Sequence, residues 1–250
     1  MEPLYRSVVG AARTLFFLQG TRFTLVGEEN VPRVGGAVMA INHTSYLDFT
    51  YAGLPPRKHG RYVRFMAKKS IFGHPVAGPL MRGMQHIPVD RHSGGQAFKD
   101  AIRALKAGEI VGVFPEATMS RSFELRDFKP GAVKMAQVAG VPILPTTIWG
   151  AHRIWTKELP KQRGRAGIPV FVTVGEPIEV GRRDDVAEAV TRLRAAMQAQ
   201  LDVQQAAYPP LSGADLRWVP ARLGGTAPTP EQAQAQDLAD MTRTRDEFTG

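Results

Sequence analysis

Two clusters of polar residues with catalytic side chains follow apolar stretches of this chain. The first, Asn42-His43-Thr44-Ser45, comes directly after the apolar run 37–41, and Asp48 lies five residues beyond His43. A short apolar run is typical of a buried strand, so the pattern predicts that His43 lies in a turn between a strand and a helix. A carboxylate in the first helical turn can reach back to the ring and leave the far nitrogen free to take a proton. A helix-capping His43 with a surface Asp48 explains the same spacing.

The second cluster follows another apolar stretch, because residues 111–118 read Val-Gly-Val-Phe-Pro-Glu-Ala-Thr. Its FPEATMS (114–120) and the earlier NHTSYLD (42–48) resemble two motifs of the glycerophospholipid acyltransferase family, which includes the 1-acylglycerol-3-phosphate acyltransferases. The two motifs stand in the family's order about seventy residues apart, which is far more specific than either motif alone. The resemblance runs from about Phe23 to Gly175.

The resemblance implies an activity and a mechanism. The protein would move a fatty acyl group from an acyl thioester to the hydroxyl of a lysophospholipid, with 1-acylglycerol-3-phosphate as the first choice of acceptor. His43 would act as the base and Asp48 would orient it. Backbone amides near Val141-Pro142, in a VPILP segment that resembles the family's fourth motif, would stabilise the oxyanion. Acyl-CoA and acyl carrier protein remain equally open as donors, and a different lipid acceptor is the alternative.

The resemblance also implies residues that bind the acceptor. Glu116 and Thr118 belong to the second cluster, and Arg91, in IPVDR, resembles the family's phosphate-binding arginine, although a salt bridge to Asp90 explains that arginine as well. Lys68 and Lys129 occupy positions that resemble basic positions of the family.

The chain departs from the family's usual Phe-Pro-Glu-Gly-Thr-Arg at two positions. Ala117 replaces the glycine, which matters only if the backbone needs a positive φ there. Met119 replaces the arginine and removes a fixed charge from the expected phosphate site. We expect Arg121 to supply that charge together with Arg91; otherwise the acceptor lacks a phosphate monoester at this point.

The pattern of elements predicts an α/β fold with a largely parallel sheet flanked by helices, because strands alternate with helices. Residues 21–208 form the predicted acyltransferase domain, with Thr44 or Ser45 capping the helix after the first site strand. Residues 1–20 form a predicted amphipathic membrane-binding helix, and the Pro/Gly-rich residues 209–250 a loosely packed tail. Expected strands are 23–26, 37–41, 62–67, 85–89, 109–114, 141–148 and 168–174, and expected helices are 93–107, 128–140, 184–207 and, capped by Thr229, a last one to about 245.

Charge points to an anionic partner. The formal net charge is +9 and the pI is near 10.1. Residues 57–91 hold eight Lys/Arg against Asp90 alone, interleaved with apolar residues, a mixture that favours an anionic phospholipid membrane. Nucleic acid is not expected, since aromatic stacking platforms are missing here. We therefore predict peripheral or monotopic attachment to the cytoplasmic face of the cell membrane. A non-catalytic membrane-binding protein is the competing interpretation, against which His43, Asp48 and Glu116 argue.

The sequence lacks the residues that covalent catalysis through an acyl-enzyme or a metal site would need. The chain has no cysteine, and no Gly-x-Ser-x-Gly elbow is present, so an acyl-enzyme intermediate is not expected. The six histidines show no metal-ligand spacing, so the sequence predicts no metal and no cofactor.

Overall fold

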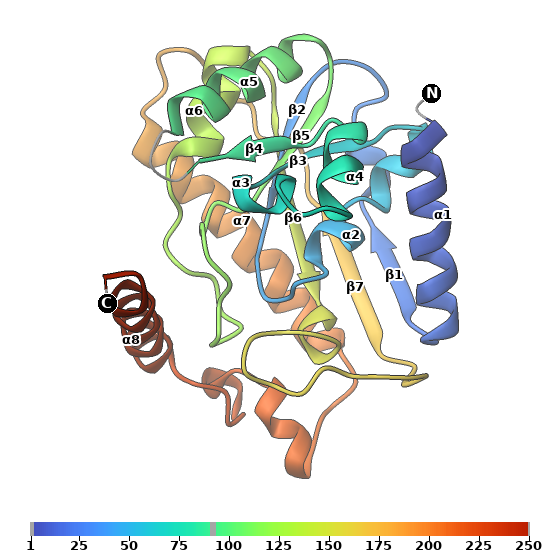
Figure 1. Ribbon diagram of the computed structural model, residues 1–250, viewed down its shortest axis with the longest axis vertical. Helices are drawn as coiled ribbons and strands as arrows, with labels where there is room; N and C mark the ends of the chain where they lie inside the picture. Colours follow the sequence, from blue (N-terminus) through green and yellow to red (C-terminus); the bar gives the residue numbers. More distant parts are fainter. Residues whose placement is uncertain (1–2, 91–93, 250) are drawn as a thin grey trace.

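A seven-stranded sheet forms the centre of the computed structural model, which describes residues 3–90 and 94–249 (Figure 1). The strand order is β1-β7-β6-β2-β5-β3-β4, and neighbours run parallel except for the antiparallel pair β6 and β7. The prediction of a largely parallel α/β sheet is therefore confirmed. The strands are β1 (Arg22–Val26), β2 (Ala37–Ile41), β3 (Val63–Lys68), β4 (Ile87–Val89), β5 (Ile110–Val113), β6 (Ile143–Trp149) and β7 (Pro169–Val174).

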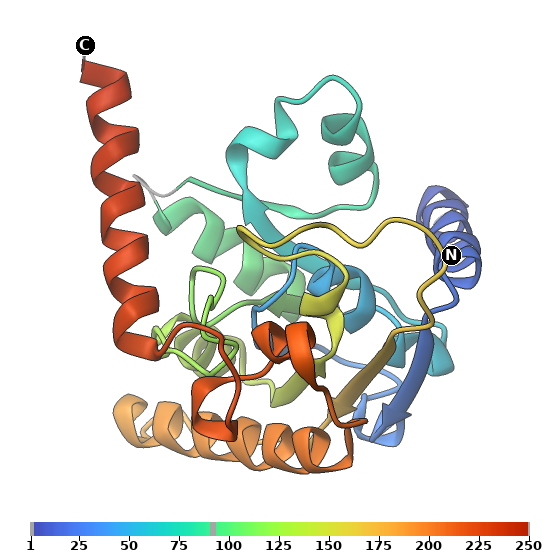
Figure 2. The same cartoon turned by 90° about the horizontal axis from the view of Figure 1, so that it is seen from below.

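Helices cover both faces of this sheet (Figures 1 and 2). They are α1 (Pro3–Leu18), α2 (Asp48–Ala52), α3 (Lys69–Phe72), α4 (Ala77–Gly83), α5 (Gly94–Lys106), α6 (Gly131–Ala139), α7 (Val186–Ala207) and α8 (Pro230–Thr249), with short 3-10 turns at Glu28–Asn30, Pro55–His59, Ala151–Arg153, Gly213–Trp218 and Ala221–Leu223. Alternate residues of β2 divide between two cores. Val38 and Ala40 belong to the core with α5, α6 and α7, whereas Met39 and Ile41 belong to the core with α1 and α2. A strand buried on both faces reads as an unbroken apolar run, which is why β2 was visible in the sequence.

Most predicted strands and helices lie within a few residues of the observed ones, and one of the shifted boundaries has a clear physical cause. The strand predicted from Gln85 begins only at Ile87. Gln85 has φ of 57°, a left-handed conformation that no strand residue adopts. The predicted helix from Ser93 is described from Gly94 on, because Ser93 lies outside the described residues.

Residues 209–240 are not loosely packed, contrary to the prediction for this part of the tail. Trp218 is buried in the core that contains α7, and Ala233 and Asp237 lie on the buried face of α8. Thr229 does cap this helix as predicted, through reciprocal hydrogen bonds between its backbone and side chain and those of Gln232. The sequence of α8 shows little apolar periodicity because the helix is held mainly by ionic contacts and buries few apolar side chains.

Helix α1 packs on the domain and also exposes apolar side chains. Tyr5 and Phe16 are buried, while Leu15, Phe17 and Leu18 are exposed, Phe17 by 72%. Within the described ranges no helix is long and apolar enough to cross a bilayer. The structure thus contains the predicted N-terminal helix, and its membrane contact stays a prediction.

The basic stretch 57–91 is only partly a surface. Arg64 is buried, pairs with Glu109 and donates to the Met84 carbonyl. Arg61 donates to the carbonyls of Pro32 and Gly108. These guanidinium groups hold β3 to its neighbours, so the predicted basic face is smaller than the sequence indicates.

Candidate active site

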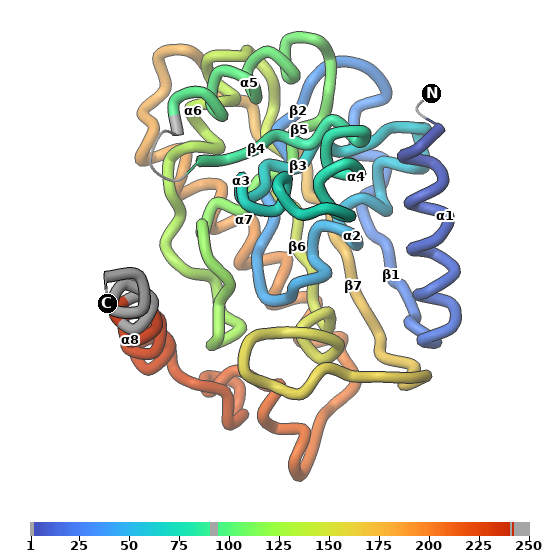
Figure 3. The backbone as a smooth tube through the Cα atoms, viewed as in Figure 1, coloured from blue at the N-terminus to red at the C-terminus, as the bar shows by residue number. Residues whose placement is uncertain are grey.

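Three loops meet at the carboxyl edge of the central strands (Figure 3). Ala40 of β2 pairs with Val113 of β5, and Ile41 pairs with Thr146 of β6, all in parallel register. The loops that follow these strands, 42–47, 114–130 and 150–168, therefore leave the same edge. Open α/β sheets bind their ligands at this edge, where the strand order changes direction.

His43 and Asp48 form the predicted pair. The imidazole Nδ1 lies 3.0 Å from Asp48 Oδ2. The ring stacks on Phe114 at a centroid distance of 4.2 Å, and 22% of the His43 side chain is exposed, whereas Asp48 is fully buried. With Nδ1–H donated to the carboxylate, Nε2 is the nitrogen that can accept a proton. The pair thus has the arrangement that general-base chemistry needs.

Asp48, rather than Thr44 or Ser45, organises the turn. Its Oδ2 accepts hydrogen bonds from the backbone N–H of Thr44 and of Ser45, each at 2.7 Å. The expected cap by either hydroxyl is wrong, because α2 begins after Leu47 without a side-chain cap. Ser45 Oγ instead accepts from Leu47 N and donates to the Trp155 carbonyl. The carboxylate therefore fixes the backbone of the turn as well as the imidazole.

Glu116 ties the second loop to the first. Its Oε1 accepts from the backbone N–H of His43 at 2.8 Å, and its Oε2 accepts from the N–H of Arg126 at 3.0 Å. The side chain is buried, so both oxygens are used within the protein. This geometry makes Glu116 a positioning residue for His43, and its predicted contact with the acceptor stays a prediction.

Burial dominates the titration of both acids. Burial raises the pKa of Asp48, and the hydrogen bonds from His43, Ser45 and Thr44 act in the opposite direction. Burial likewise raises the pKa of Glu116 to about 7, against the hydrogen bonds from the amides of Arg126 and His43. A protonated Glu116 cannot hold both amides equally well, so we expect the site to be best ordered above neutral pH.

Further hydrogen bonds that were not predicted hold the same turn. Ser120 N donates to the His43 carbonyl at 2.7 Å, and Thr156 Oγ1 donates to the Thr44 carbonyl at 2.7 Å. The side chain of Asn42 both donates to and accepts from the backbone of Ile148. Each of these partners lies more than seventy positions away, and the contacts use backbone groups of His43, Thr44 and Ile148 that no side-chain pattern reveals.

The two departures from the family pattern have structural consequences. Ala117 has φ of 59°, so an alanine stands where the backbone needs the conformation that glycine adopts freely. Met119 is buried, and its sulfur lies 3.5 Å from Thr156 Oγ1. Met119 thus contacts the third loop, and Thr118 beside it is half-buried.

Arg121 does not present a free charge. Its guanidinium pairs with Glu158, Asp237 and Asp240, and the side chain is buried. Burial alone would lower the pKa of Arg121, but the carboxylates of Glu158 and Asp237 raise it above its usual range. The guanidinium that we expected to bind phosphate is therefore already paired with three carboxylates of the protein.

The remaining predicted basic residues are less constrained. Lys68 is exposed at the end of β3, and Lys129 is exposed with its backbone N–H donated to the Pro115 carbonyl. Both lysines thus border the edge that carries His43. Arg91 lies outside the described residues.

The expected oxyanion donors are at the wrong edge. Pro142 accepts from Val38 N near the start of β2, and Val141 N donates to the Ala136 carbonyl. Since His43 follows the other end of β2, about five residues away, the separation is on the order of 15 Å. The Val141-Pro142 turn cannot stabilise an oxyanion beside His43.

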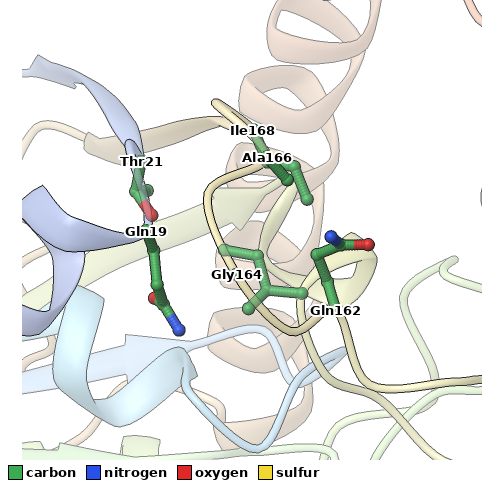
Figure 4. A pocket seen from close by; sticks show the side chains of 7 residues that line it. Gln19, Thr21, Gln162, Gly164, Ala166 and Ile168 are labelled. Carbon is green, nitrogen blue, oxygen red and sulfur yellow. The ribbon is translucent and has the colours of Figure 1, made fainter.

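Other ligand sites are limited among the described residues. No three His, Asp or Glu side chains lie close enough there to hold a metal ion. A small pocket between the end of α1 and residues 162–168 is lined by side chains that include Gln19, Gln162 and Ile168 (Figure 4). No predicted site residue lines it, so it is separate from the His43 site.

Comparison with known proteins agrees with this geometry. The family model described as Acyltransferase matches residues 22–149. The chain belongs to the acyltransferase family. It is 32% identical over 176 residues to the 1-acyl-sn-glycerol-3-phosphate acyltransferase of Bacillus subtilis, covering 70% of this chain and 82% of that protein. It is 29% identical over 170 residues to the enzyme of that name from Borreliella burgdorferi, covering 66% of this chain and 64% of that protein.

A solved structure has the same fold. The crystal structure of the 1-acyl-sn-glycerophosphate (LPA) acyltransferase PlsC from Thermotoga maritima matches with a TM-score of 0.66 and 21% identity, covering 82% of this chain and 81% of that one. The matched family segment, 22–149, contains both motifs and ends before the third loop. The protein is therefore an acyltransferase, and residues 150–250 lie outside the family model.

Proposed function

We propose that this acyltransferase moves a fatty acyl group from an acyl thioester to the free hydroxyl of 1-acylglycerol-3-phosphate, giving phosphatidate. The observation that carries the proposal is the His43–Asp48 pair, with the partly exposed imidazole at the carboxyl edge of the sheet. The names of the relatives from Bacillus and Borreliella support the choice of acceptor.

The chemistry follows from the geometry of the pair. Asp48 holds Nδ1–H, so Nε2 takes the proton as the acceptor oxygen attacks the thioester carbonyl. The new C–O bond forms, the C–S bond breaks, and the leaving thiolate recovers the proton from the imidazolium. The reaction needs neither a metal nor a cofactor. The donor is acyl-CoA or acyl carrier protein, which share the thioester that this scheme uses.

Recognition of the phosphate falls to Lys68 and Lys129 in this proposal. Both are exposed, on elements that border the His43 edge, whereas Arg121 is engaged with three carboxylates. Lysine binds phosphate as a point charge rather than through a two-pronged contact. The buried Met119 favours a second candidate, in which the acceptor is a lipid without a phosphate monoester.

A product analysis separates these candidates. Purified protein is incubated with palmitoyl-CoA or palmitoyl-acyl carrier protein and with lysophosphatidate, lysophosphatidylglycerol or lysophosphatidylethanolamine, and products are identified by mass. We expect phosphatidate, with His43→Ala as the inactive control. Product from another lysolipid and none from lysophosphatidate would reject the proposed acceptor and favour the second candidate.

We also propose that the protein acts at an anionic membrane surface through α1 and the loop beside it. Leu15, Phe17 and Leu18 are exposed at the end of α1, and the guanidinium of Arg165 lies 6.0 Å from the Phe17 ring. Lys161 and Arg163 are exposed in the same loop. Exposed apolar side chains beside cations are the combination that binds the interface of anionic bilayers.

Vesicle co-sedimentation tests the membrane proposal. Phe17→Ser should weaken binding to vesicles containing phosphatidylglycerol, and the remaining binding should fall as salt rises. Val203→Ser is the matched control, since Val203 is also exposed but lies on α7, which covers the opposite face of the sheet. Equal binding by the two variants and the unmodified protein would contradict the proposed surface.

A further inference from the structure

An ionic cluster joins α8 to the loops of the active site. Asp237 accepts from Arg121 Nε at 2.9 Å, from Arg126 at 2.6 Å and from Lys157 at 3.3 Å. Arg121 also pairs with Asp240. Figures 1 and 2 place the first turns of α8 beside the loop after β5. A single buried carboxylate thus binds three cations from two different loops.

Each of these cations is next to, or part of, the hydrogen-bonded frame around His43. Arg121 follows Ser120, whose N–H donates to the His43 carbonyl. Lys157 follows Thr156, whose hydroxyl donates to the Thr44 carbonyl. Arg126 itself donates its backbone N–H to Glu116, which accepts the N–H of His43 with its other oxygen. Asp237 therefore contacts three residues that either make, or are adjacent in sequence to residues that make, the hydrogen bonds around His43.

A second anchor holds the same C-terminal segment. His152 Nε2 lies 3.0 Å from the Trp218 carbonyl, and its ring stacks on Phe123 of the second loop at 4.4 Å. Arg222 pairs with Glu124 of that loop at 3.3 Å. The C-terminal segment consequently contacts the loop after β5 at two places. One is the ion pairs of Asp237, and the other is the region of Trp218 and Arg222.

We infer that residues 209–240 form a clasp that sets the position of Glu116 and His43, and that Asp237 is its positioning residue. Asp237 touches no reacting group, so it acts through Arg126 and Glu116. Burial by itself would raise the pKa of Asp237, but Arg121, Lys157 and Arg126 lower it below its ordinary value, so the clasp is charged at neutral pH. The family model matches residues 22–149, so the clasp lies outside the matched segment.

Hydrogen–deuterium exchange of the full-length protein tests the clasp without reference to any substrate. Asp237→Asn keeps the shape of the side chain and removes its charge. We expect amides in peptides covering 42–48 and 114–128 to exchange about tenfold faster or more, because charged hydrogen bonds are lost from the frame. Asp100→Asn removes one carboxylate from an exposed pair on α5 and should leave both peptides unchanged. Equal exchange by the two variants would overturn the inference.

Enzyme kinetics provides a second test, which rests on the proposed function. Partial unfolding alone would not change kcat while leaving KM and the folded fraction unchanged. At a temperature where both variants are folded, Asp237→Asn should lower kcat about tenfold or more and leave KM for lysophosphatidate nearly unchanged. The acid limb of its pH–rate profile should move to higher pH, because Glu116, which also faces His43 and Asp48, loses part of its hydrogen bonding. Asp237→Glu should restore part of kcat.

The outcomes separate the clasp from the proposed activity. If the unmodified protein acylates no lysophosphatidate, the proposed function fails, and the exchange experiment still decides on the clasp. If the unmodified protein is active and Asp237→Asn has unchanged or higher kcat, the clasp is wrong and the function stands. Arg126→Met keeps the backbone N–H but breaks the ion pair, so it should reproduce Asp237→Asn, and the double variant should show little further loss.

Discussion

Replacing Glu116 by glutamine should change stability by an amount that depends strongly on pH. Burial raises the pKa of Glu116 from 4.5 to about 7. Below pH 4.5 the carboxyl is protonated in the folded and the unfolded chain, and its burial carries no ionic cost. As pH rises from about 4.5 to 7, the unfolded chain ionises first, so the folded state loses stability. Between pH 5 and 8 the loss is about 2–3 kcal/mol.

The glutamine variant lacks this titration. Its side-chain oxygen can accept from one of the amides of His43 and Arg126, but its NH₂ group faces the other amide as a second donor. An unpaired buried donor costs about 1–3 kcal/mol at every pH. We therefore expect Glu116→Gln to be less stable than the unmodified protein at pH 5 and about equal to it at pH 8.

Urea unfolding of both proteins at pH 5, 6.5 and 8, followed by circular dichroism, measures this difference. The stability of the variant relative to the unmodified protein should rise by about 2–3 kcal/mol from pH 5 to 8. Taking the difference at each pH cancels the titration of all other groups. Glu176→Gln, at an exposed position, is the control for losing one negative charge. A difference that stays constant with pH would refute the claim that burial raises the pKa of Glu116.

Three further substitutions follow from the same structure. Asp48→Asn should lower kcat about a hundredfold or more with little change in KM for the acceptor, because the ring loses its tautomer control; unchanged kcat in steady-state assays would argue against the pair. Ala117→Gly should raise the unfolding free energy by about 1 kcal/mol in urea titrations, since φ of 59° strains alanine, and a destabilised variant would contradict this. Arg121→Ala should cost about 3 kcal/mol of stability by leaving Asp237 less well paired, with KM for lysophosphatidate unchanged; a large rise in KM without loss of stability would restore Arg121 as a phosphate ligand.

The sequence predicts those parts of the protein that depend on local pattern. The strands of the parallel sheet are short apolar runs between turn residues, and β2 is buried on both faces, so it could be recognised without any partner. The His43–Asp48 contact spans only five residues, so a strand, a turn and one helical turn are enough to predict it.

The parts that could not be predicted depend on distant charges and on backbone conformation. Arg121 looks like a free cation in the sequence, because Asp237 lies 116 residues away with no motif of its own. Glu116 resembles a ligand of the substrate, whereas its partners are two backbone amides that no side-chain pattern reveals. The C-terminal segment has too few periodic apolar residues to indicate packing, since Trp218 and Asp237 anchor it instead.

The central claim is that His43 is the base of an acyl transfer to lysophosphatidate. The most direct test is the initial rate of phosphatidate formation by His43→Ala and by the unmodified protein, at saturating acyl thioester and lysophosphatidate. Circular dichroism establishes that the variant is folded, as expected for a side chain that is partly exposed. The rate should fall by about 10²- to 10⁴-fold. A folded His43→Ala protein that forms phosphatidate at the full rate would contradict the mechanism.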